Sequence, residues 1–404
     1  MSGAHPSQTA AAWPVVALII GAGVISACQV GKASMALKAV QGELQLGLGT
    51  AAWLMSAFAV IGAVAGAPIG LAVDRIGARR MALCSLVVMG IGSALGAFSS
   101  DAKMLLATRV FEGLGFLGLT VAAPTLIAAA APASIRGRAM ALWAVFMPVG
   151  MTVVFLSAPL MSWLTWRGFW LFNAGILIGY AALLGWAVSA SESFRANHNS
   201  ILGDIREAIT APGPWVLGGL FVVFSCVFFA LFSFLPTLLA ERLGVSDESA
   251  SLLSAAAIAL SGVGNIVGGQ LLTRGVPSIY LLTAGFSAMV LGGIGVFSAP
   301  TLEWGVYALC VVFAFASGFV PVVIFKSAPD YAPHSSLVGA TLGFAMQGNN
   351  IGLLIGPVVA GGLVSAFSWS AVSLLISVSG FLAVLLLIAF QKLHVQPGRR
   401  ALQL

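Results

Sequence analysis

Three ionisable side chains, Lys32, Arg109 and Glu112, lie well inside long apolar stretches of the sequence. A charge in such a stretch is costly unless it is paired, so residues of this kind are candidates for function. Arg109 and Glu112 are three residues apart, and a helix therefore places them on one face. Glu112 is the only acidic residue so placed, and no histidine is. If the protein moves a proton, Glu112 is the best candidate to carry it.

Gln29 lies three residues before Lys32 and shares its predicted helix face. Lys32, Arg109 and Glu112 fall at comparable depth when counted from the ends of their apolar stretches. Two cations and one acid leave one net positive charge, which would attract an anionic or acceptor-rich solute. Two other interpretations are open: the Lys32 side chain could extend to the aqueous boundary, and Arg109 and Glu112 could form a static structural pair.

The composition identifies the medium in which these charges are buried. Hydrophobic residues make up 60% of the 404 residues and charged residues only 7%, whereas soluble domains carry about 25% charged residues. The chain is therefore expected to be an integral membrane protein. Its net charge of +6 indicates loops that face a negative lipid surface rather than nucleic acid. The four cysteines form no CxxC pair and are interpreted as small buried hydrophobic residues.

Twelve apolar runs are long enough to span a bilayer, which takes about 20 residues each. They lie at about 14–37, 50–71, 81–100, 104–130, 139–163, 169–190, 215–238, 249–272, 279–298, 305–325, 337–366 and 369–390. The sequence thus predicts an all-α membrane protein with an N-terminal six-helix half over 1–190, a cytoplasmic central loop over 191–214 and a C-terminal six-helix half over 215–404.

The basic residues predict the orientation. An even number of spans places both termini on one side, and that side receives twelve Lys and Arg residues against four on the other. Because positive loops remain in the cytoplasm, both termini are predicted to be cytoplasmic.

The segment "GLAVDRIGARR" connects the second and third runs. Its pattern, Gly70-x3-Asp74-Arg75-x-Gly77-x-Arg79-Arg80, resembles the signature loop of the major facilitator superfamily, with Ala78 in place of a usual basic residue. A weak second copy, "GGQLLTRGVP", follows the eighth run. The resemblance implies two parallel six-helix halves, alternating access and a conformational gating role for this loop.

The same resemblance implies a partner for Asp74. The carboxylate would bind the N-terminus of the 337–366 helix, for which Ser335 and Ser336 are natural N-caps, and would stabilise the outward-facing state. A role in topology alone is the other interpretation.

Two further segments are similar to motifs of that family. "RVFEGLG", at 109–115, resembles its helix-4 motif, with Glu112 where glutamine is more usual. The 337–366 run carries Gly352, Gly356, Pro357 and Gly361, a small-residue pattern suited to helix packing. The 139–163 run keeps only Pro159 of the proton antiporter pattern that the family has there.

Polar and aromatic residues supply further candidates. Gln347, Asn349 and Asn350 in the 337–366 run could bind solute or bond a neighbouring helix. Four phenylalanines near one face of the 215–238 run could line a cavity or pack against lipid and protein; they are Phe221, Phe224, Phe228 and Phe232.

These observations predict a secondary active transporter rather than an enzyme, moving a small organic, possibly amphiphilic solute with the proton gradient as its only cofactor. Export is favoured over uptake of an organic anion; a non-transporting sensor or scaffold on the same fold is the alternative of another class. "VGKAS" lacks the first glycine of an ATP-binding loop, and no metal motif occurs. The expected setting is the lipid bilayer of a bacterial inner membrane, as a monomer without nucleic-acid or ATP partners.

Overall fold

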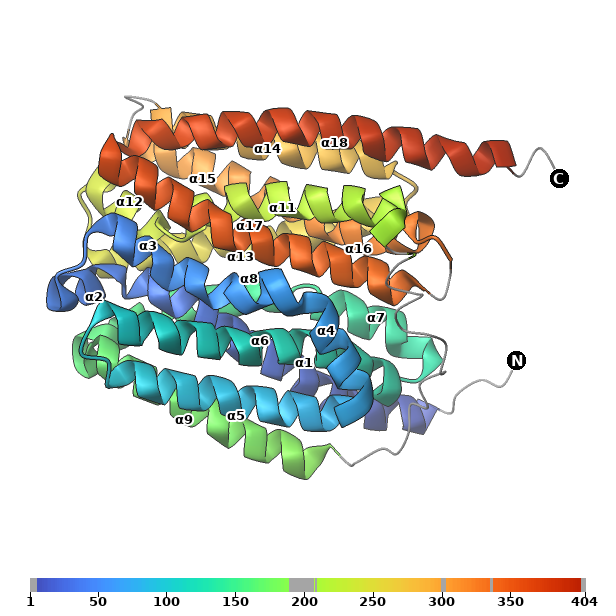
Figure 1. Cartoon of the computed structure of the whole chain (residues 1–404), viewed down its shortest axis with the longest axis horizontal. Coiled ribbons are helices and arrows are strands. Elements are labelled where there is room, and N and C mark those ends of the chain that lie inside the picture. The colour runs from blue at the N-terminus through green and yellow to red at the C-terminus, as the bar shows by residue number, and fades with distance from the viewer. Residues whose placement is uncertain (1–5, 189–206, 208, 299–302, 335–336, 401–404) are drawn as a thin grey trace. The chain divides into compact units, whose positions relative to one another are not determined.

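The computed structural model describes residues 6–188, 207, 209–298, 303–334 and 337–400. In the described residues the elements are helices, without a strand (Figure 1). Eleven helical stretches of the described residues are long and apolar enough to cross a membrane. The shorter apolar helix α8 (Phe146–Leu156) lies in the remaining predicted run, 139–163. The all-α membrane fold predicted from the sequence is confirmed. Most of the predicted central loop, 191–214, lies outside the described residues.

The contacts divide the chain into two compact units, which are described separately. The first contains residues 1–46 and 68–196, and the second contains 47–67 and 197–404. The predicted halves differ from this grouping in one segment, 47–67, because helix α3 (Leu48–Ser56) and the short η1 (Ala57–Ala59) pack along helix α17 of the second unit. Helix α4 (Val60–Ile76) continues from the second unit into the first and is kinked at Ala65.

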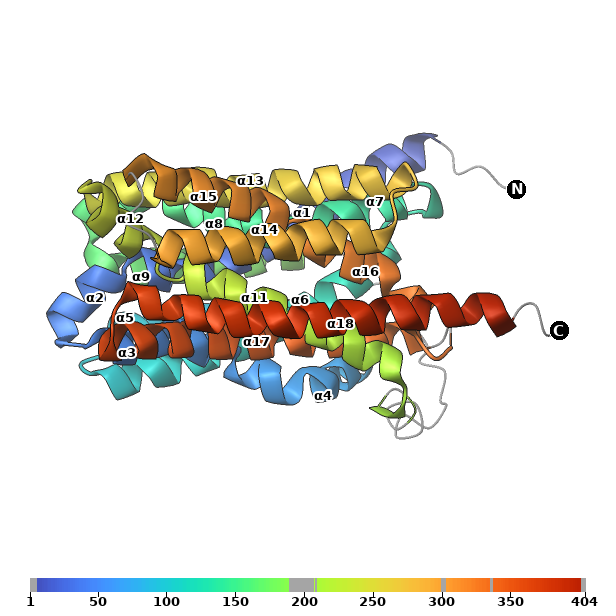
Figure 2. The ribbon, with the colours of Figure 1, turned by 90° about the horizontal axis from the view of Figure 1, so that it is seen from above.

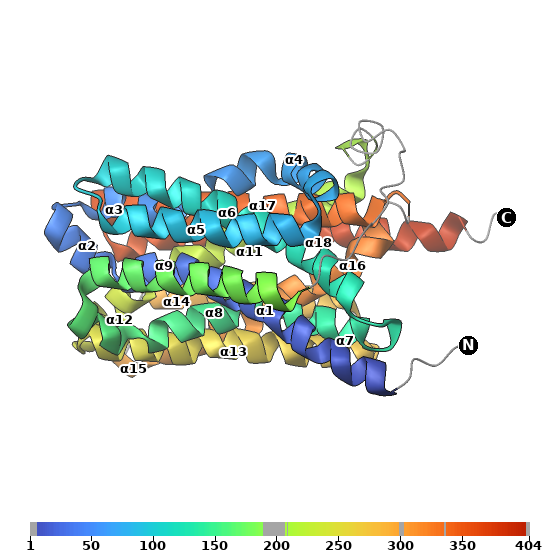
Figure 3. The same cartoon turned by 90° about the horizontal axis from the view of Figure 1, so that it is seen from below.

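The first unit is built around four long helices, which are labelled in Figure 3. They are α1 (Pro6–Met35), α5 (Ala78–Ala97), α6 (Ala102–Ala130) and α9 (Met161–Ala187). Shorter elements connect them: α2 (Leu37–Leu44), α7 (Ala133–Trp143), α8 and η2 (Ala158–Leu160). Helix α5 packs against both α6 and α9, and α1 packs against α6, α8 and α9. The four long helices therefore share one interior.

One predicted run in this unit is wrong as a single helix. The run at 139–163 is divided among α7, α8, η2 and the start of α9, because Pro148 and Pro159 each lack the backbone N–H that a continuous helix needs. The following run begins earlier than predicted, at Met161, and is interrupted at Thr165, which has φ 54° and ψ 174°.

The second unit contains the remaining helices (Figure 2). They are α11 (Pro212–Phe232), α12 (Leu235–Leu243), α13 (Asp247–Thr273), α14 (Ser278–Ser298), α15 (Glu303–Ser317), α16 (Phe319–Tyr331), α17 (Val338–Ala366), η4 (Trp369–Ala371) and α18 (Val372–Arg400). The predicted run at 305–325 corresponds to two helices, α15 and α16, that meet at Gly318.

Glycines allow α17 to approach α11 backbone to backbone. A Cβ atom added to Gly348, Gly352 or Gly356 would lie 2.2–2.4 Å from a carbonyl oxygen of α11. These three glycines are four residues apart, so they form one stripe on the helix. The stripe includes Gly352 and Gly356, for which the sequence predicts a packing role. Gly361 faces α3 instead, where a Cβ would lie 2.5 Å from Ala52 Cβ, and Pro357 lies within the helix.

Candidate functional site

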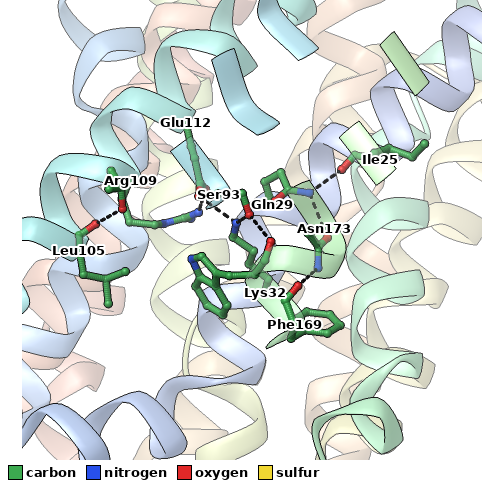
Figure 4. A network of polar contacts seen from close by, with 11 residues as sticks. Ile25, Gln29, Lys32, Ser93, Leu105, Arg109, Glu112, Phe169 and Asn173 are labelled. Atoms are coloured by element: carbon green, nitrogen blue, oxygen red, sulfur yellow. Dashed lines mark hydrogen bonds and ion pairs between the residues drawn. The ribbon is translucent and has the colours of Figure 1, made fainter. Parts of the chain in front are cut away.

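The charged residues predicted from the sequence meet in the interior of the first unit (Figure 4). Helix α1 carries Lys32, and α6 carries Arg109 and Glu112. All three side chains have zero exposed surface. Among the described residues, no other Asp, Glu, Lys or Arg is buried. This cluster of Lys32, Arg109 and Glu112 is called the charged triad below.

Glu112 is the centre of the triad. Its Oε1 accepts a hydrogen bond from Lys32 Nζ at 2.9 Å, and its Oε2 accepts one from Arg109. Each carboxylate oxygen thus bonds a different cation, one from its own helix and one from α1. Lys32 does not extend to the aqueous boundary, as one interpretation of the sequence allowed, because its side chain is fully buried and bound to Glu112.

Two residues from other helices complete the surroundings of the Lys32 ammonium. Its Nζ also donates to Ser93 Oγ of α5 at 2.7 Å, and Ser93 Oγ donates in turn to the Trp170 carbonyl oxygen of α9 at 2.8 Å. The ammonium lies 4.7 Å from the centroid of the Trp170 ring, within the range of a cation–π contact. The ammonium is therefore held by a carboxylate, a hydroxyl and an aromatic face.

Gln29 lies beside the triad but bonds a different partner. Its Nε2 donates to Asn173 Oδ1 at 3.1 Å and to the Ile25 carbonyl, while Asn173 Nδ2 donates to the Phe169 carbonyl at 2.9 Å. Gln29 Oε1 is buried and has no hydrogen-bond partner. A second, uncharged polar pair thus joins α1 to α9 close to Lys32 (Figure 4).

Space for Glu112 and for Trp170 depends on two glycines of α5. A Cβ at Gly92 would lie 2.8 Å from Glu112 Cγ, and a Cβ at Gly96 would lie 2.8 Å from Trp170 Cδ1. Sequence reasoning missed these glycines together with Ser93. The signal that could have found them is the segment Gly90-x-Gly92-Ser93-x-x-Gly96, whose small residues at helical spacing allow close packing of helices.

Trp170 and Asn173 were also missed. Asn173 is an amide inside an apolar run, and such residues usually bond another helix. No sequence signal marks Trp170, because tryptophan is also common at positions that face lipid.

The polar residues of α17 make bonds within the second unit. Asn349 Oδ1 accepts from Ser225 Oγ of α11 at 2.5 Å, Gln347 Nε2 donates to the Ala63 carbonyl at 2.9 Å, and Asn350 Nδ2 donates to the Met346 carbonyl at 2.9 Å. The bonds of Asn349 and Gln347 reach neighbouring helices, whereas that of Asn350 stays within α17. The structure does not bring them into one cluster with the charged triad, which belongs to the first unit.

The four phenylalanines of α11 are all buried. Their rings follow one another, with centroids 5.7 Å apart for Phe221 and Phe224, 5.4 Å for Phe224 and Phe228, and 4.5 Å for Phe228 and Phe232. Phe232 also contacts Phe313 of α15. The stacked rings therefore form part of the packing of the second unit.

The signature loop is described in part. Gly77 has φ 88°, a conformation that favours glycine, and it starts α5. Arg79 donates to the carbonyls of Val188 and Gly185 at the end of α9, both at 2.5 Å, and Arg80 is exposed.

The side chains of the predicted latch are not described. The side chains of Gly70, Asp74 and Arg75 are not described, and neither are Ser335 and Ser336. Helix α17 begins at Val338, with Leu337 at its N-cap.

Comparisons with known proteins agree with this architecture. A family model for the Major Facilitator Superfamily matches residues 19–340. The chain is 27% identical to the chloramphenicol resistance protein of Streptomyces lividans over 352 residues, which cover 81% of this chain and 87% of the relative. It is 28% identical to the 3-(3-hydroxy-phenyl)propionate transporter of Escherichia coli (strain K12) over 366 residues, which cover 85% of this chain and 86% of the relative.

A solved structure has the same fold at low sequence identity. It is a bacterial homolog of the human lysosomal transporter Spinster in an inward-facing, occupied conformation, with a TM-score of 0.74, 17% identity and 98% coverage of both chains. Since the family model covers most of the chain and the fold is shared, this chain belongs to the Major Facilitator Superfamily and is a multi-pass membrane transporter of small solutes.

Proposed function

We propose that this protein is a proton-coupled transporter of a small organic solute in which Glu112 binds the coupling proton. The observation that carries the proposal is the bridging of Lys32 and Arg109 by a fully buried Glu112 carboxylate. Buried ionisable residues in membrane-spanning helices are characteristic of proton relays. In the described residues no other buried side chain is an acid.

The charge of the triad gives the coupling a physical basis. Glu112 in its carboxylate form leaves one net positive charge among the three residues. A proton on Glu112 raises this to two, and it also weakens the hold of the carboxyl group on Lys32 and Arg109. Two buried cations without a counter-charge are unfavourable. The protonated state therefore favours either a change of conformation or the approach of an anion.

Export of the solute is the direction that we propose. The relative from Streptomyces lividans, which is similar over 81% of this chain, is a chloramphenicol resistance protein. An acceptor-rich, partly apolar solute of that kind fits the prediction from the sequence.

Uptake of an organic anion is the second candidate. It is favoured by the similarity to a 3-(3-hydroxy-phenyl)propionate transporter over 85% of this chain. The rise in positive charge on protonation also favours it, since an anion and a proton would then bind together.

Transport in liposomes tests the coupling. Purified full-length protein is reconstituted in liposomes with an imposed pH gradient, and the movement of radiolabelled chloramphenicol and of 3-(3-hydroxy-phenyl)propionate is followed. The parent should accumulate one of the probes against its gradient, and Glu112→Gln should bind the probe without accumulating it. Accumulation by Glu112→Gln equal to that of the parent would show that the proton is carried elsewhere or that transport is uncoupled.

A second variant keeps this test decisive if Glu112→Gln does not fold. The double variant Lys32→Met/Glu112→Gln removes one cation and the acid together, so that Arg109 leaves the parent's single net positive charge. It too should bind the probe without accumulating it. The sign of the required gradient separates the two directions: a proton gradient directed opposite to solute movement indicates antiport, and one in the same direction indicates symport.

A further inference from the structure

Helix α2 follows the end of α1 that is remote from the N-terminus (Figure 1). A second charged group begins on this helix. Glu43 of α2 accepts a hydrogen bond from Arg167 Nε at 2.7 Å on Oε1 and from Trp166 Nε1 at 2.5 Å on Oε2. The Glu43 side chain is 46% exposed, whereas Trp166 is only 2% exposed. A carboxylate at the surface therefore holds a buried indole.

Contacts lead inward from this indole to the charged triad. The Trp166 ring meets the Trp170 ring edge to face, with centroids 5.5 Å apart and an interplanar angle of 89°. The Trp170 ring lies next to the Lys32 ammonium. The backbone carbonyl of Trp170 accepts a hydrogen bond from Ser93 Oγ, which in turn accepts one from the same ammonium. Two aromatic rings thus connect Glu43 to the cation that binds Glu112.

The backbone beside Trp166 is strained. Thr165, which immediately precedes it, has φ 54° and ψ 174°, a conformation that β-branched residues rarely adopt. Such outliers persist where the surrounding structure fixes them. Arg167, on the other side of Trp166, donates to the Ala97 carbonyl at the end of α5 at 2.7 Å and stacks 4.4 Å from the Trp166 ring. The start of α9 is therefore held by both α2 and α5.

From these contacts we infer that Glu43 is a positioning residue for the Lys32–Glu112 pair. Glu43 holds the Trp166 indole, and the Trp166 ring packs against the Trp170 ring. Trp170 and Ser93 together hold the Lys32 ammonium against the Glu112 carboxylate. The inference rests on the proposed proton role of Glu112. It adds to that role a surface residue whose hydrogen bonds go to Trp166 and Arg167 and not to Glu112.

The electrostatics of Glu43 suit an anchor that faces water. The hydrogen bond from Arg167, followed by that from Trp166, lowers the pKa of the Glu43 carboxyl below its ordinary value. A carboxyl whose pKa is depressed in the folded state contributes stability above its unfolded pKa and loses it only as the pH falls through the folded value. The anchor is therefore retained when the medium on its side of the membrane becomes mildly acidic.

An infrared titration of the full-length protein in liposomes tests the inference without a solute. The carboxylic-acid band of the parent or of a variant, minus that of the same protein carrying Glu112→Gln, reports the protonation of Glu112 as a function of pH. Glu43→Ala removes both acceptor oxygens. Trp166→Phe removes the indole N–H and keeps a ring. In both variants the midpoint should move to higher pH by about half a unit, or about threefold in the proton-binding constant, because a loosely held ammonium stabilises the carboxylate less.

Two further variants distinguish positioning from a general loss of structure. Glu43→Gln keeps an acceptor for the Trp166 N–H, so its midpoint should move less than that of Glu43→Ala. The double variant Glu43→Ala/Trp166→Phe should show little shift beyond that of either single variant, because both break the same bond. A lowered unfolding temperature without a moved midpoint would show a structural role only.

The matched control is Asp101→Asn, which removes an exposed carboxylate at the start of α6 that accepts a bond from Met104 N of the same helix. Its midpoint should equal that of the parent.

If Glu43→Ala and Trp166→Phe leave the midpoint unmoved, or if Asp101→Asn moves it equally, the inference is wrong while the proton role of Glu112 stands. If the parent shows no band that depends on Glu112, the proton role fails and this inference fails with it. If Glu43→Ala does not fold, Trp166→Phe and Glu43→Gln decide.

Discussion

The charge balance of the triad is set by single residues. Glu112 is bound on both oxygens, so its removal leaves Lys32 and Arg109 without a counter-charge, whereas the removal of Lys32 leaves a neutral pair of Arg109 and Glu112. A buried ion pair that loses one partner costs about 3–5 kcal/mol because the other charge is stranded. The residues of the triad are therefore expected to be unequal in their effect on stability.

The first prediction compares Glu112→Gln with Lys32→Met. Glu112→Gln should lower the free energy of unfolding by about 3–5 kcal/mol, and Lys32→Met should lower it by clearly less, because Met fills the volume of the lysine stem and leaves no stranded charge. Denaturant unfolding of both variants in the same detergent measures the difference. Equal losses would show that the three charges do not act as one balanced group.

The second prediction concerns the space beside Glu112. In Gly92→Ala the new Cβ would lie 2.8 Å from Glu112 Cγ and 3.2 Å from its backbone N, so α5 and α6 must separate. Overpacking of this kind costs about 1–3 kcal/mol, and gradient-driven transport should fall with it. The control is Gly179→Ala on α9, where no atom lies within 4 Å of the new Cβ. That variant should be no less stable than the parent, because alanine favours a helix more than glycine does. A similar loss in both variants would show that the effect does not come from contact with Glu112.

Packing between helices depends on stripes of small residues. The α17 stripe of Gly348, Gly352 and Gly356 lies against carbonyl oxygens of α11. Without strong hydrophobic attraction between helices in lipid, such close backbone contact is a main source of helix association. The second unit should therefore depend on these positions and not on a glycine such as Gly362, where an added Cβ meets no atom within 4 Å.

The third prediction tests this stripe with alanine. Gly352→Ala places a Cβ 2.4 Å from the Val222 carbonyl oxygen, whereas Gly362→Ala on the same helix meets nothing within 4 Å. Gly352→Ala should lower the free energy of unfolding by about 1–3 kcal/mol, and Gly362→Ala should leave it unchanged. Thermal unfolding of the two variants in detergent provides the comparison, and a stable Gly352→Ala would contradict the packing role.

The fourth prediction concerns the signature loop between α4 and α5. If Asp74 binds the N-terminus of α17, Asp74→Asn should remove an interaction worth up to about 2 kcal/mol while changing little volume. Transport should then fall by about tenfold or more, which corresponds to about 1.4 kcal/mol, in a protein that still folds. Accessibility labelling should show less of the outward-facing state. Parent-like transport in Asp74→Asn would leave only a role in topology.

Orientation is a property of the whole molecule. Twelve apolar runs and the uneven distribution of basic residues predict cytoplasmic termini. The fifth prediction is that a reporter fused after Leu404 is active only in its cytoplasm-reporting form. A periplasmic signal at Leu404 would contradict both the orientation and the even number of spans.

The sequence alone determined the membrane class, the number of apolar runs and the identity of the buried charges. Each of these follows from a local cost: a residue inside lipid must be apolar or paired, so an exception such as Glu112 is visible without a structure. The family resemblance of the loop from Gly70 to Arg80 likewise depends on neighbouring residues. What local signals could not give is the continuity of helices, so the division of 139–163 at Pro148 and Pro159 was missed although both prolines were visible.

Only the tertiary structure decided what each buried charge binds. Lys32 reaches Ser93 and Glu112, which are 61 and 80 residues away along the chain, and Gln29 reaches Asn173 across 144 residues. These partners depend on which faces of four helices turn inward, and an apolar helix in lipid shows little polar contrast between its faces. The role of Gly92 follows from the position of Glu112 and not from its own neighbours. For the same reason the chain of contacts from Glu43 through Trp166 to Trp170 could be found only once α2 and α9 were in place.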